Sequence, residues 1–139
     1  MSFKRTFLAT IISPFASIIV LAFQLIKFFY SAEVMPPLDG VLWVIITSVT
    51  VTFVMVASIG FVAHSILSTF GLTHWYIYSF LGALASIYYK YNALVDSNMP
   101  NDLRTMEYLT YGLNGFLVSL TFWAIAVRTS ESHKPLNKD

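Results

Sequence analysis

The chain contains an uninterrupted apolar run, with no ionisable residue between Val41 and Ala63. This run is longer than the about 18 residues that indicate a membrane-spanning helix. A water-soluble fold could not cover it, because 57% of the 139 residues are hydrophobic and only 11% are charged. The sequence therefore predicts an integral membrane protein embedded in a lipid bilayer.

A short break, Gly71-Leu72-Thr73, separates this run from a second one. Gly71 is suited to the left-handed conformation that ends a helix, and Thr73 is suited to cap the next helix. Between Trp75 and Val95, only Lys90 interrupts the second run. Because so short a connection makes two helices antiparallel neighbours, we expect a transmembrane hairpin.

Two further apolar segments flank the hairpin. The first follows Lys4 and Arg5, is too long for the apolar part of a signal peptide, and contains Pro14, which removes a backbone hydrogen-bond donor. The residues from Asp96 to Glu107 form the only sizeable hydrophilic loop before the last segment. We therefore expect an all-α, integral membrane four-helix bundle that forms a single domain over residues 1–139. Its spans are expected at about residues 6–30, 41–70, 74–95 and 108–127.

The charges predict the orientation of the chain in the membrane. An even number of spans puts both termini on one side, which carries Lys4, Arg5, Arg128, Lys134 and Lys138 against Glu131 and Asp139. The loops on the other side are mainly acidic, with Glu33, Asp39, Asp96, Asp102 and Glu107. Because Lys and Arg favour the cytoplasmic side, we expect both termini in the cytoplasm.

Two stretches point to a cellular source. The segment from Gly71 to Ala83 and the ending from Phe122 to Arg128 resemble small four-span membrane proteins of bacteria that have no assigned function. This resemblance implies a bacterial cytoplasmic (inner) membrane and carries no activity with it.

The first span has a polar stripe on one face of the helix, formed by Thr6, Thr10, Ser13, Ser17, Gln24 and Lys27. We expect this face to point into the bundle or toward a partner, away from lipid. One interpretation is a polar path or a docking face built from Ser13, Ser17, Gln24 and Lys27. The favoured one is hydrogen bonding between helices, with the lysine side chain extending to the lipid headgroups.

Small residues mark faces on the other three spans. The last two spans carry a candidate packing face made of Ser79, Gly82, Ser86, Gly112, Gly115 and Ser119. The second span has a stripe of Thr47, Thr50, Ser58, Ser65 and Ser68. Small side chains let helix backbones approach closely in lipid. These faces can pack within one chain, form a homo-oligomer, or dock on a larger membrane protein.

The histidines provide a test for haem, which paired membrane histidines can ligate. In an antiparallel hairpin His64 and His74 differ in depth by about six residues, or about 9 Å. Because a haem between neighbouring helices needs both ligands at similar depth, the spacing disfavours a haem. We expect both histidines near the cytoplasmic interface, with an uncertain role, and we expect no cofactor and no metal.

The remaining chemistry is sparse. Asp96, Asn98, Asp102 and Glu107 fall at calcium-loop positions, but Pro100 and Asn101 do not fit that loop. The segment is better interpreted as a turn, with Asn101 or Asp102 capping the last helix. The chain has no cysteine and no motif of a serine hydrolase, a zinc protease or a phosphate-binding loop. A net charge of +1 without a basic run gives no reason to expect nucleic-acid binding.

Three functions are compatible with this pattern. The first is a non-enzymatic accessory, assembly, immunity or regulatory protein that docks on a larger membrane protein by helix–helix contacts. The second is an oligomeric channel or transporter for ions or small solutes, with the stripe of the first span lining the path. The third is a membrane redox subunit associated with haem or quinone. The near absence of charge inside the spans, which hold no carboxylate, and the absence of any catalytic motif favour the first.

Overall fold

The computed structural model describes residues 3–31, 37–95 and 97–128, apart from the side chains of Lys27, Phe28 and Ser31. Of these residues 91% are helical, and none of them lies in a strand. The chain is therefore all-α over its described length. The elements are α1 (Phe3–Ile12), η1 (Ser13–Ala16), α2 (Ser17–Ser31), α3 (Leu38–Met55), η2 (Val56–Gly60), α4 (Phe61–Thr69), α5 (Trp75–Leu94), α6 (Asn101–Trp123) and η3 (Ala124–Arg128).

Helices α1, η1 and α2 follow one another without a break and form the first rod, residues 3–31. Pro14 lies within η1, which is a 3-10 helix, because proline cannot donate the hydrogen bond that an α-helix needs at that position. The Ser17 hydroxyl donates to the carbonyl of Pro14 at 2.6 Å. The proline thus tightens one turn of the rod without ending it.

Helices α3, η2 and α4 form the second rod, Leu38–Thr69. Its middle segment, η2, is a π-helix. The rod ends as the sequence predicts, because Gly71 has a φ of +70°. The Gly71 amide donates to the carbonyl of Ser68 at 3.3 Å, and the Leu72 amide donates to the carbonyl of Leu67 at 2.9 Å. This is the Schellman arrangement, which satisfies the last carbonyls of a helix.

The capping predictions were wrong at both later helices. Helix α5 begins at Trp75 with His74 as its N-cap residue, one residue later than expected, and no side chain caps it. Thr73 is instead part of the connection, where its carbonyl accepts a hydrogen bond from the Trp123 indole at 2.6 Å. Helix α6 is preceded by Pro100 and has no side-chain cap either.

The hydrophilic loop is shorter than predicted, because α6 already begins at Asn101. The first turns of α6 are held against the end of α5 by an ion pair between Lys90 and Glu107, at 2.7 Å. The Arg104 side chain closes the remaining loop by donating to the carbonyls of Ser97 at 2.8 Å and Met99 at 3.3 Å. Contacts with α5 thus extend a helix into a segment whose composition is typical of a loop.

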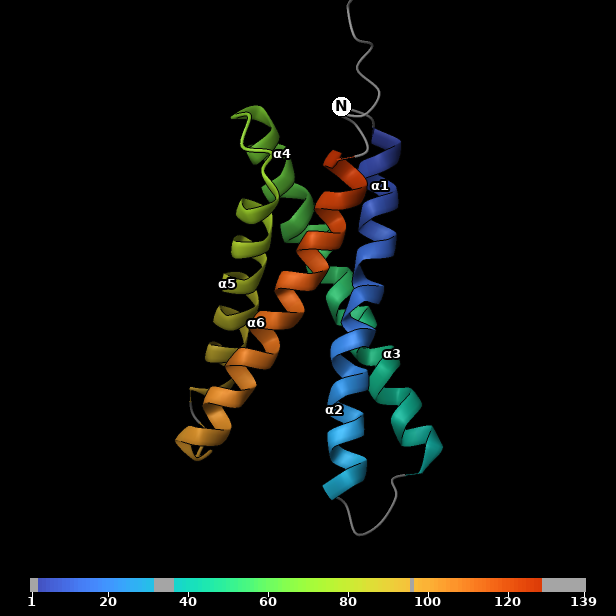
Figure 1. The fold of residues 1–139 in the computed structure, drawn as a ribbon, viewed down its shortest axis with the longest axis vertical. Coiled ribbons are helices and arrows are strands. Elements are labelled where there is room, and N and C mark those ends of the chain that lie inside the picture. Colours follow the sequence, from blue (N-terminus) through green and yellow to red (C-terminus); the bar gives the residue numbers. More distant parts are fainter. Residues whose placement is uncertain (1–2, 32–36, 96, 129–139) are drawn as a thin grey trace, which may run out of the picture.

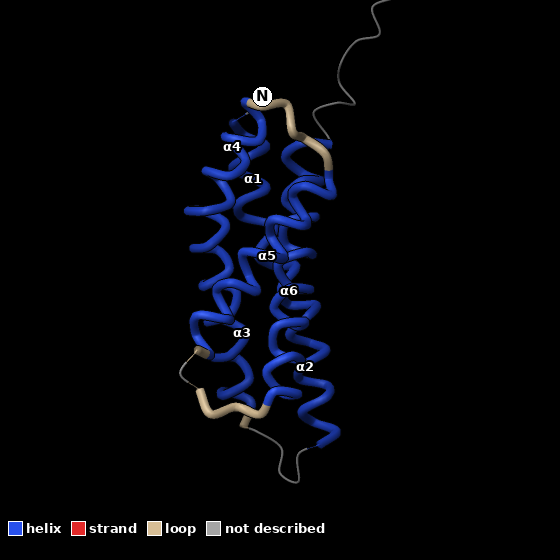
Figure 2. Tube along the Cα trace, turned by 90° about the vertical axis from the view of Figure 1, so that its left-hand side faces the viewer, coloured by secondary structure: helices blue, strands red, loops and turns tan. Residues whose placement is uncertain are grey.

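The rods run side by side along the long axis of the molecule (Figures 1 and 2). At the end where α1 begins and η3 finishes, they converge on a buried apolar cluster. The cluster consists of Ala9, Leu67, Tyr78, Phe122, Ala126 and Val127. Toward the opposite end, α5 and α6 diverge from α2 and α3 (Figure 1). The molecule is therefore closely packed at one end and open at the other.

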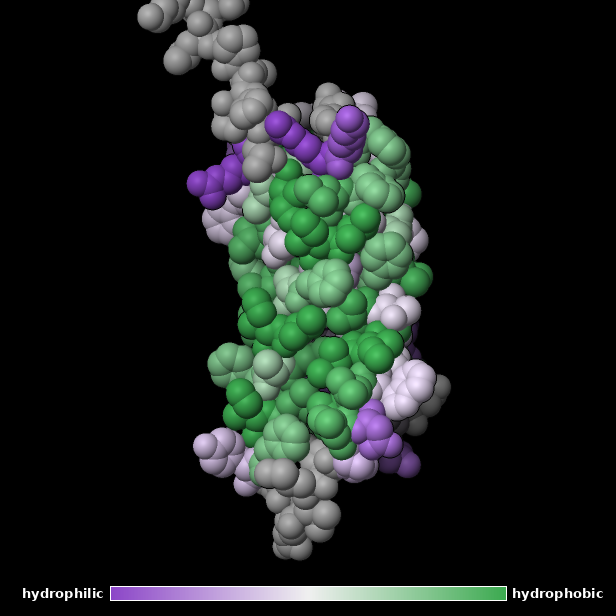
Figure 3. Space-filling view, turned by 90° about the vertical axis from the view of Figure 1, so that its right-hand side faces the viewer, coloured by the Kyte–Doolittle hydropathy of each residue, from purple (hydrophilic) through white to green (hydrophobic). Residues whose placement is uncertain are grey.

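Within the described residues, three helices are long and apolar enough to cross a membrane, namely Phe3–Ile26, Leu38–Thr69 and Asn101–Arg128. One side of the molecule shows an apolar band with hydrophilic surface at both ends (Figure 3). Helix α5 is 20 residues long but is not among these three, because its five tyrosines, Lys90 and Asn92 lower its hydropathy. The length and composition of these helices thus support a membrane protein.

Candidate functional site

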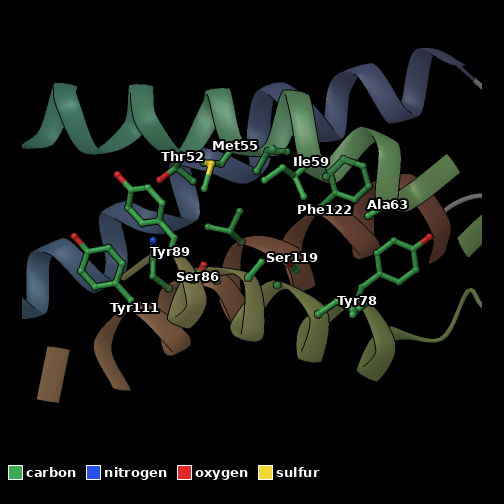
Figure 4. Close-up of a pocket in the computed structure, with 18 of the residues that line it drawn as sticks. Thr52, Met55, Ile59, Ala63, Tyr78, Ser86, Tyr89, Tyr111, Ser119 and Phe122 are labelled. Atoms are coloured by element: carbon green, nitrogen blue, oxygen red, sulfur yellow. The ribbon is translucent and has the colours of Figure 1, made fainter. Parts of the chain in front are cut away.

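A cavity of about 300 Å³ lies between the second rod on one side and α5 and α6 on the other (Figure 4). We call it the inner cavity. Residues of the second rod that line it include Thr52, Met55, Ile59 and Ala63. From α5 and α6 come, among others, Tyr78, Ser86, Asn114, Ser119 and Phe122. The space is the size of the smaller pockets that hold organic molecules in proteins, which start at about 300 Å³.

Helical periodicity places these side chains on the cavity. On α5 the lining positions include Tyr78, Gly82, Ser86 and Tyr89, and on α6 they include Tyr111, Asn114, Gly115, Val118 and Phe122. Both sets recur every three or four residues, which is the repeat of one face of an α-helix. The cavity is therefore a lengthwise feature of the fold and follows the α5–α6 groove.

A second, wider cavity of about 900 Å³ lies between α2, α3 and α6, in the open part of the molecule. We call it the outer cavity. The two cavities share a group of lining residues, which we call the junction: Val51, Thr52, Tyr89, Tyr111 and Asn114. The two cavities are therefore neighbours, and the junction side chains lie where they meet.

The junction contains a polar group that the fold leaves without a partner. The side-chain oxygen Oδ1 of Asn114 is buried and accepts no hydrogen bond from the described residues. The nearby Thr52 hydroxyl is already used, since it donates to the carbonyl of Ser48 at 2.8 Å. A buried amide oxygen without a hydrogen-bond donor costs about 1–3 kcal/mol of folding free energy. A ligand that donates a hydrogen bond to Asn114 Oδ1 would remove this cost.

Charge is confined to the rim of the outer cavity. Glu107 lines this cavity and pairs with Lys90. The Lys90 ammonium also lies 4.4 Å from the ring centroid of Tyr111, in cation–π contact. None of the residues that line the inner cavity is charged. Polarity thus falls from the rim through the junction to the inner cavity.

A buried histidine packs beside the aromatic end of the inner cavity. His64 is 1% exposed, and its Nδ1 lies 2.6 Å from the Tyr78 hydroxyl. Its ring packs edge-on against Phe122, with centroids 5.3 Å apart. Its other nitrogen, Nε2, is buried without a hydrogen-bond partner. Tyr78 and Phe122 line the inner cavity where the second rod meets α5 and α6, and His64 packs against both of them from outside the cavity lining.

The two histidines have different surroundings. His74 is exposed at the N-cap of α5, and its ring lies 5.2 Å from the ring of Tyr76. His64, which the sequence places near the interface, is enclosed by protein. No group of three or more His, Cys, Asp or Glu that could hold a metal ion occurs in the described part of the chain.

The stripe of the first span faces the protein interior along most of its length. Thr6, Thr10, Ser13 and Ser17 are buried. The Ser13 hydroxyl has no partner among the described residues, whereas the Thr10 hydroxyl donates to the carbonyl of Thr6 at 2.9 Å. Ser17 and the half-buried Gln24 line the outer cavity. The Lys27 side chain lies outside the described residues.

The residues of the candidate packing face form the contact between α5 and α6. A Cβ atom added to Gly82 would collide with Ser119 Oγ and lie 2.6 Å from the carbonyl oxygen of Gly115. One added to Gly115 would collide with the carbonyl of Gly82 and with Ser86 Oγ. A Cβ atom added to Gly112 would lie 3.0 Å from Ile87 Cδ1, and Ser79 is buried nearby along α5. The two helices therefore touch backbone to backbone.

Comparison of the chain with protein families, with curated proteins and with solved structures gives no match. The site therefore has to be interpreted from its own geometry.

Sequence reasoning did not find the junction. Tyr89, Tyr111 and Asn114 were not among the site residues that the sequence predicted. One signal was present, because Asn114 is an amide in the middle of the last span, where a polar side chain needs a partner. That partner could not be sought without knowing which helices surround the amide.

Proposed function

We propose that this is a non-enzymatic integral membrane protein that acts by docking on a larger membrane protein. It has four spans, with both termini in the cytoplasm of a bacterium, and serves as an accessory, assembly, immunity or regulatory factor. The docking surface is the outward face of the second rod, Leu38–Thr69.

One observation carries this proposal: in the most apolar window of the second rod, 0% of the residues are buried inside the protein. The corresponding windows of Phe3–Ile26 and Asn101–Arg128 are 44% and 33% buried. Helices associate in lipid through close packing, because lipid tails are as apolar as the helices themselves. A rod that packs so little within its own chain has its contact surface available for a partner.

The outward face of this rod has the side chains that close packing uses. Thr50, Ser58 and Ser65 are exposed and lie on the side of the rod away from the inner cavity. Each hydroxyl donates to the carbonyl four residues earlier, at 2.8, 2.6 and 2.9 Å respectively. Because these hydroxyls are already satisfied, the stripe favours a partner through its small size and not through hydrogen bonds.

The other small or polar faces have found contacts within the chain. Gly82 and Gly115 meet each other, and Ser13 and Ser17 are buried in the first rod. In the stripe of the second rod, by contrast, Thr50, Ser58 and Ser65 are exposed. This difference between faces supports docking through the second rod in preference to the others.

The fourth span of the proposal is α5. Its 20 residues correspond to about 30 Å at about 1.5 Å per residue, which matches the thickness of the hydrocarbon core. It packs along α6, so its tyrosines need not all face lipid. With four spans, the Lys and Arg residues near the termini favour a cytoplasmic location of both ends.

Cysteine crosslinking tests the docking surface directly, because the chain has no cysteine of its own. Ser58→Cys places a single thiol on the proposed face, and Ile19→Cys places one on the first rod, where Ile19 is 58% exposed. Each variant is expressed in its native membrane and treated with a short bifunctional thiol–amine reagent. We expect Ser58→Cys, and not Ile19→Cys, to yield a defined higher-mass product that contains a second protein.

The same experiment separates the remaining possibilities. A product made only of two copies of this chain would replace the partner with a homo-oligomer. Equal products from both positions, or none from either, would contradict docking through the second rod. Topology is tested separately with Ser97→Cys, which we expect a membrane-impermeant maleimide to label from outside the cell.

A path for a small solute is the second candidate, and the outer cavity favours it. Ser17 and Gln24 from the stripe of the first span line this cavity. The path would be blocked at the other end, where Ala9, Phe122 and Ala126 belong to the buried apolar cluster. Flux through liposomes that is lost in Gln24→Leu, at normal insertion, would support this candidate over docking.

A further inference from the structure

The inner cavity has the geometry of a binding site for one small molecule. It extends from the junction at Asn114 to the aromatic end at Tyr78 and Phe122, and Figure 4 shows these rings bordering the same space as Met55 and Ile59. An engineered protein cavity of about 150 Å³ holds benzene, so the about 300 Å³ found here accommodates roughly twice that bulk. Empty space of this size forfeits dispersion contacts along its whole lining.

The chemistry of the lining selects the kind of molecule. No charged side chain borders the inner cavity, so a charged ligand would lose its hydration without gaining a counter-charge. Most of the border is apolar, with residues such as Met55, Ile59, Val118 and Phe122. The ligand that fits is therefore neutral and mainly apolar, with a ring or a short chain.

The unpartnered amide fixes where a polar group of that molecule would lie. Asn114 Oδ1 is buried, has no donor among the described residues and stands at the junction of the two cavities. The side chains of Tyr89 and Tyr111 belong to the same junction. A hydroxyl group on the ligand could donate to Asn114 and accept from a tyrosine, which would satisfy the amide.

We propose that the inner cavity binds a neutral amphiphile, with its hydroxyl-type head group at Asn114 and its apolar part toward Phe122. The molecule enters through the outer cavity and the junction. This binding is additional to docking and does not depend on it, because the inner cavity and the outward stripe lie on opposite sides of the second rod.

Photoaffinity labelling tests the site with a defined probe. The probe is a medium-chain primary alcohol that carries an alkyl diazirine, applied to the full-length protein in phosphatidylcholine nanodiscs. We expect labelled peptides from the inner cavity, containing Met55, Ile59 or Val118, and we expect an excess of unlabelled alcohol to suppress them. The matching alkane without the hydroxyl should compete about tenfold less well, as expected for one lost hydrogen bond to a buried acceptor.

Two variants and one control locate the binding. Asn114→Leu removes the acceptor and should weaken labelling about tenfold. Ala63→Phe fills the inner cavity while leaving Asn114 in place, and should abolish labelling. Asn92→Leu makes the same chemical change on the exposed surface of α5, where the amide donates to the carbonyl of Tyr88, and should leave labelling unchanged.

Other outcomes would overturn the proposal. Labelling that is unchanged in Asn114→Leu and in Ala63→Phe would mean that the alcohol does not enter the inner cavity. Labels spread over lipid-facing residues such as Ile19 would mean general contact with membrane components. If the site is supported, competition by neutral lipids extracted from the native membrane shows a membrane source, and competition by small alcohols added in water shows a soluble one.

Discussion

Two contacts of α5 and α6 illustrate opposite ways of packing helices in this protein. With each other, these helices meet backbone to backbone, because Gly82 and Gly115 leave no room for even one added methyl group. With the second rod, they meet across a cavity of about 300 Å³. The first contact is specified by small residues, whereas the second is made at one end only, around His64. Close packing thus holds one pair rigidly, and the rod beside it stays loosely attached.

The largest effect on stability is expected from a glycine-to-alanine change, which adds one methyl group, at the α5–α6 contact. The matched change in the second rod serves as the comparison. Gly115→Ala should lower the free energy of unfolding by about 3 kcal/mol, because the new Cβ meets the fixed backbone of Gly82. Gly60→Ala should instead raise it by about 1 kcal/mol, the usual gain in helix propensity. Its Cβ would lie 3.4 Å from Val56, in ordinary contact.

Unfolding in mixed detergent and SDS, followed by tryptophan fluorescence, measures both free energies. Equal losses for the two alanine variants would mean that the contact between α5 and α6 is no tighter than the contact with the second rod.

The next effect concerns the point where the second rod is attached. Tyr78→Phe removes the hydroxyl that lies 2.6 Å from His64 Nδ1 and leaves both ring nitrogens of this buried histidine without partners. We expect a loss of about 2 kcal/mol in the free energy of unfolding. The double variant His64→Phe/Tyr78→Phe should recover much of this loss, since replacing both polar partners avoids a buried unpaired group. Simple addition of the two single effects in a double-mutant cycle would show that the pair is not coupled.

A smaller effect is expected where the connection between the second rod and α5 is tied to α6. Trp123→Phe deletes the indole that donates to the carbonyl of Thr73 at 2.6 Å. We expect a global loss of about 1 kcal/mol. Amide hydrogen exchange should rise in residues 70–74 and stay unchanged in the loop at residues 97–100. A uniform rise over the whole chain would contradict a local tie.

The smallest effect is expected at the open end of the α5–α6 pair. The side chains of Lys90 and Glu107 are 16% and 34% exposed, so either Lys90→Met or Glu107→Gln should cost about 1 kcal/mol or less. The exchange variant Lys90→Glu/Glu107→Lys should regain part of the loss measured for Lys90→Glu alone. Thermal unfolding of the four proteins at low and high salt measures this, and high salt should reduce every difference. A loss that salt does not change would indicate packing of the Lys90 stem, not charge.

The first comparison of this series also probes the proposed ligand. Bound amphiphile would stabilise the wild-type protein and should do little for Asn114→Leu. Because Gly115 lines the inner cavity as well as the α5–α6 contact, Gly115→Ala should reduce both stability and probe labelling. The two readouts together distinguish damage to the contact from damage to the cavity.

Local chemistry was enough to predict a large part of the fold. The apolar run before Ala63 identified a membrane helix. Gly71 located the end of the second rod, because a helix commonly ends at a glycine in the left-handed conformation. Pro14 marked the place where the first rod tightens into a 3-10 turn. Each of these features depends on a few consecutive residues and needs no knowledge of their neighbours in space.

Features that depend on contacts between distant residues could not be predicted in the same way. The caps assigned to Thr73 and to Asn101 or Asp102 were wrong, and α6 begins at Asn101 because its first turns pack on α5. The spacing of Gly82 and Gly115 indicated packing faces without telling which face meets which. The inner cavity and the unpartnered amide of Asn114 arise from three helices at once. The sequence determines the residue pattern of each helix. A cavity is the space that several helices leave between them, so only their arrangement in the tertiary structure defines it.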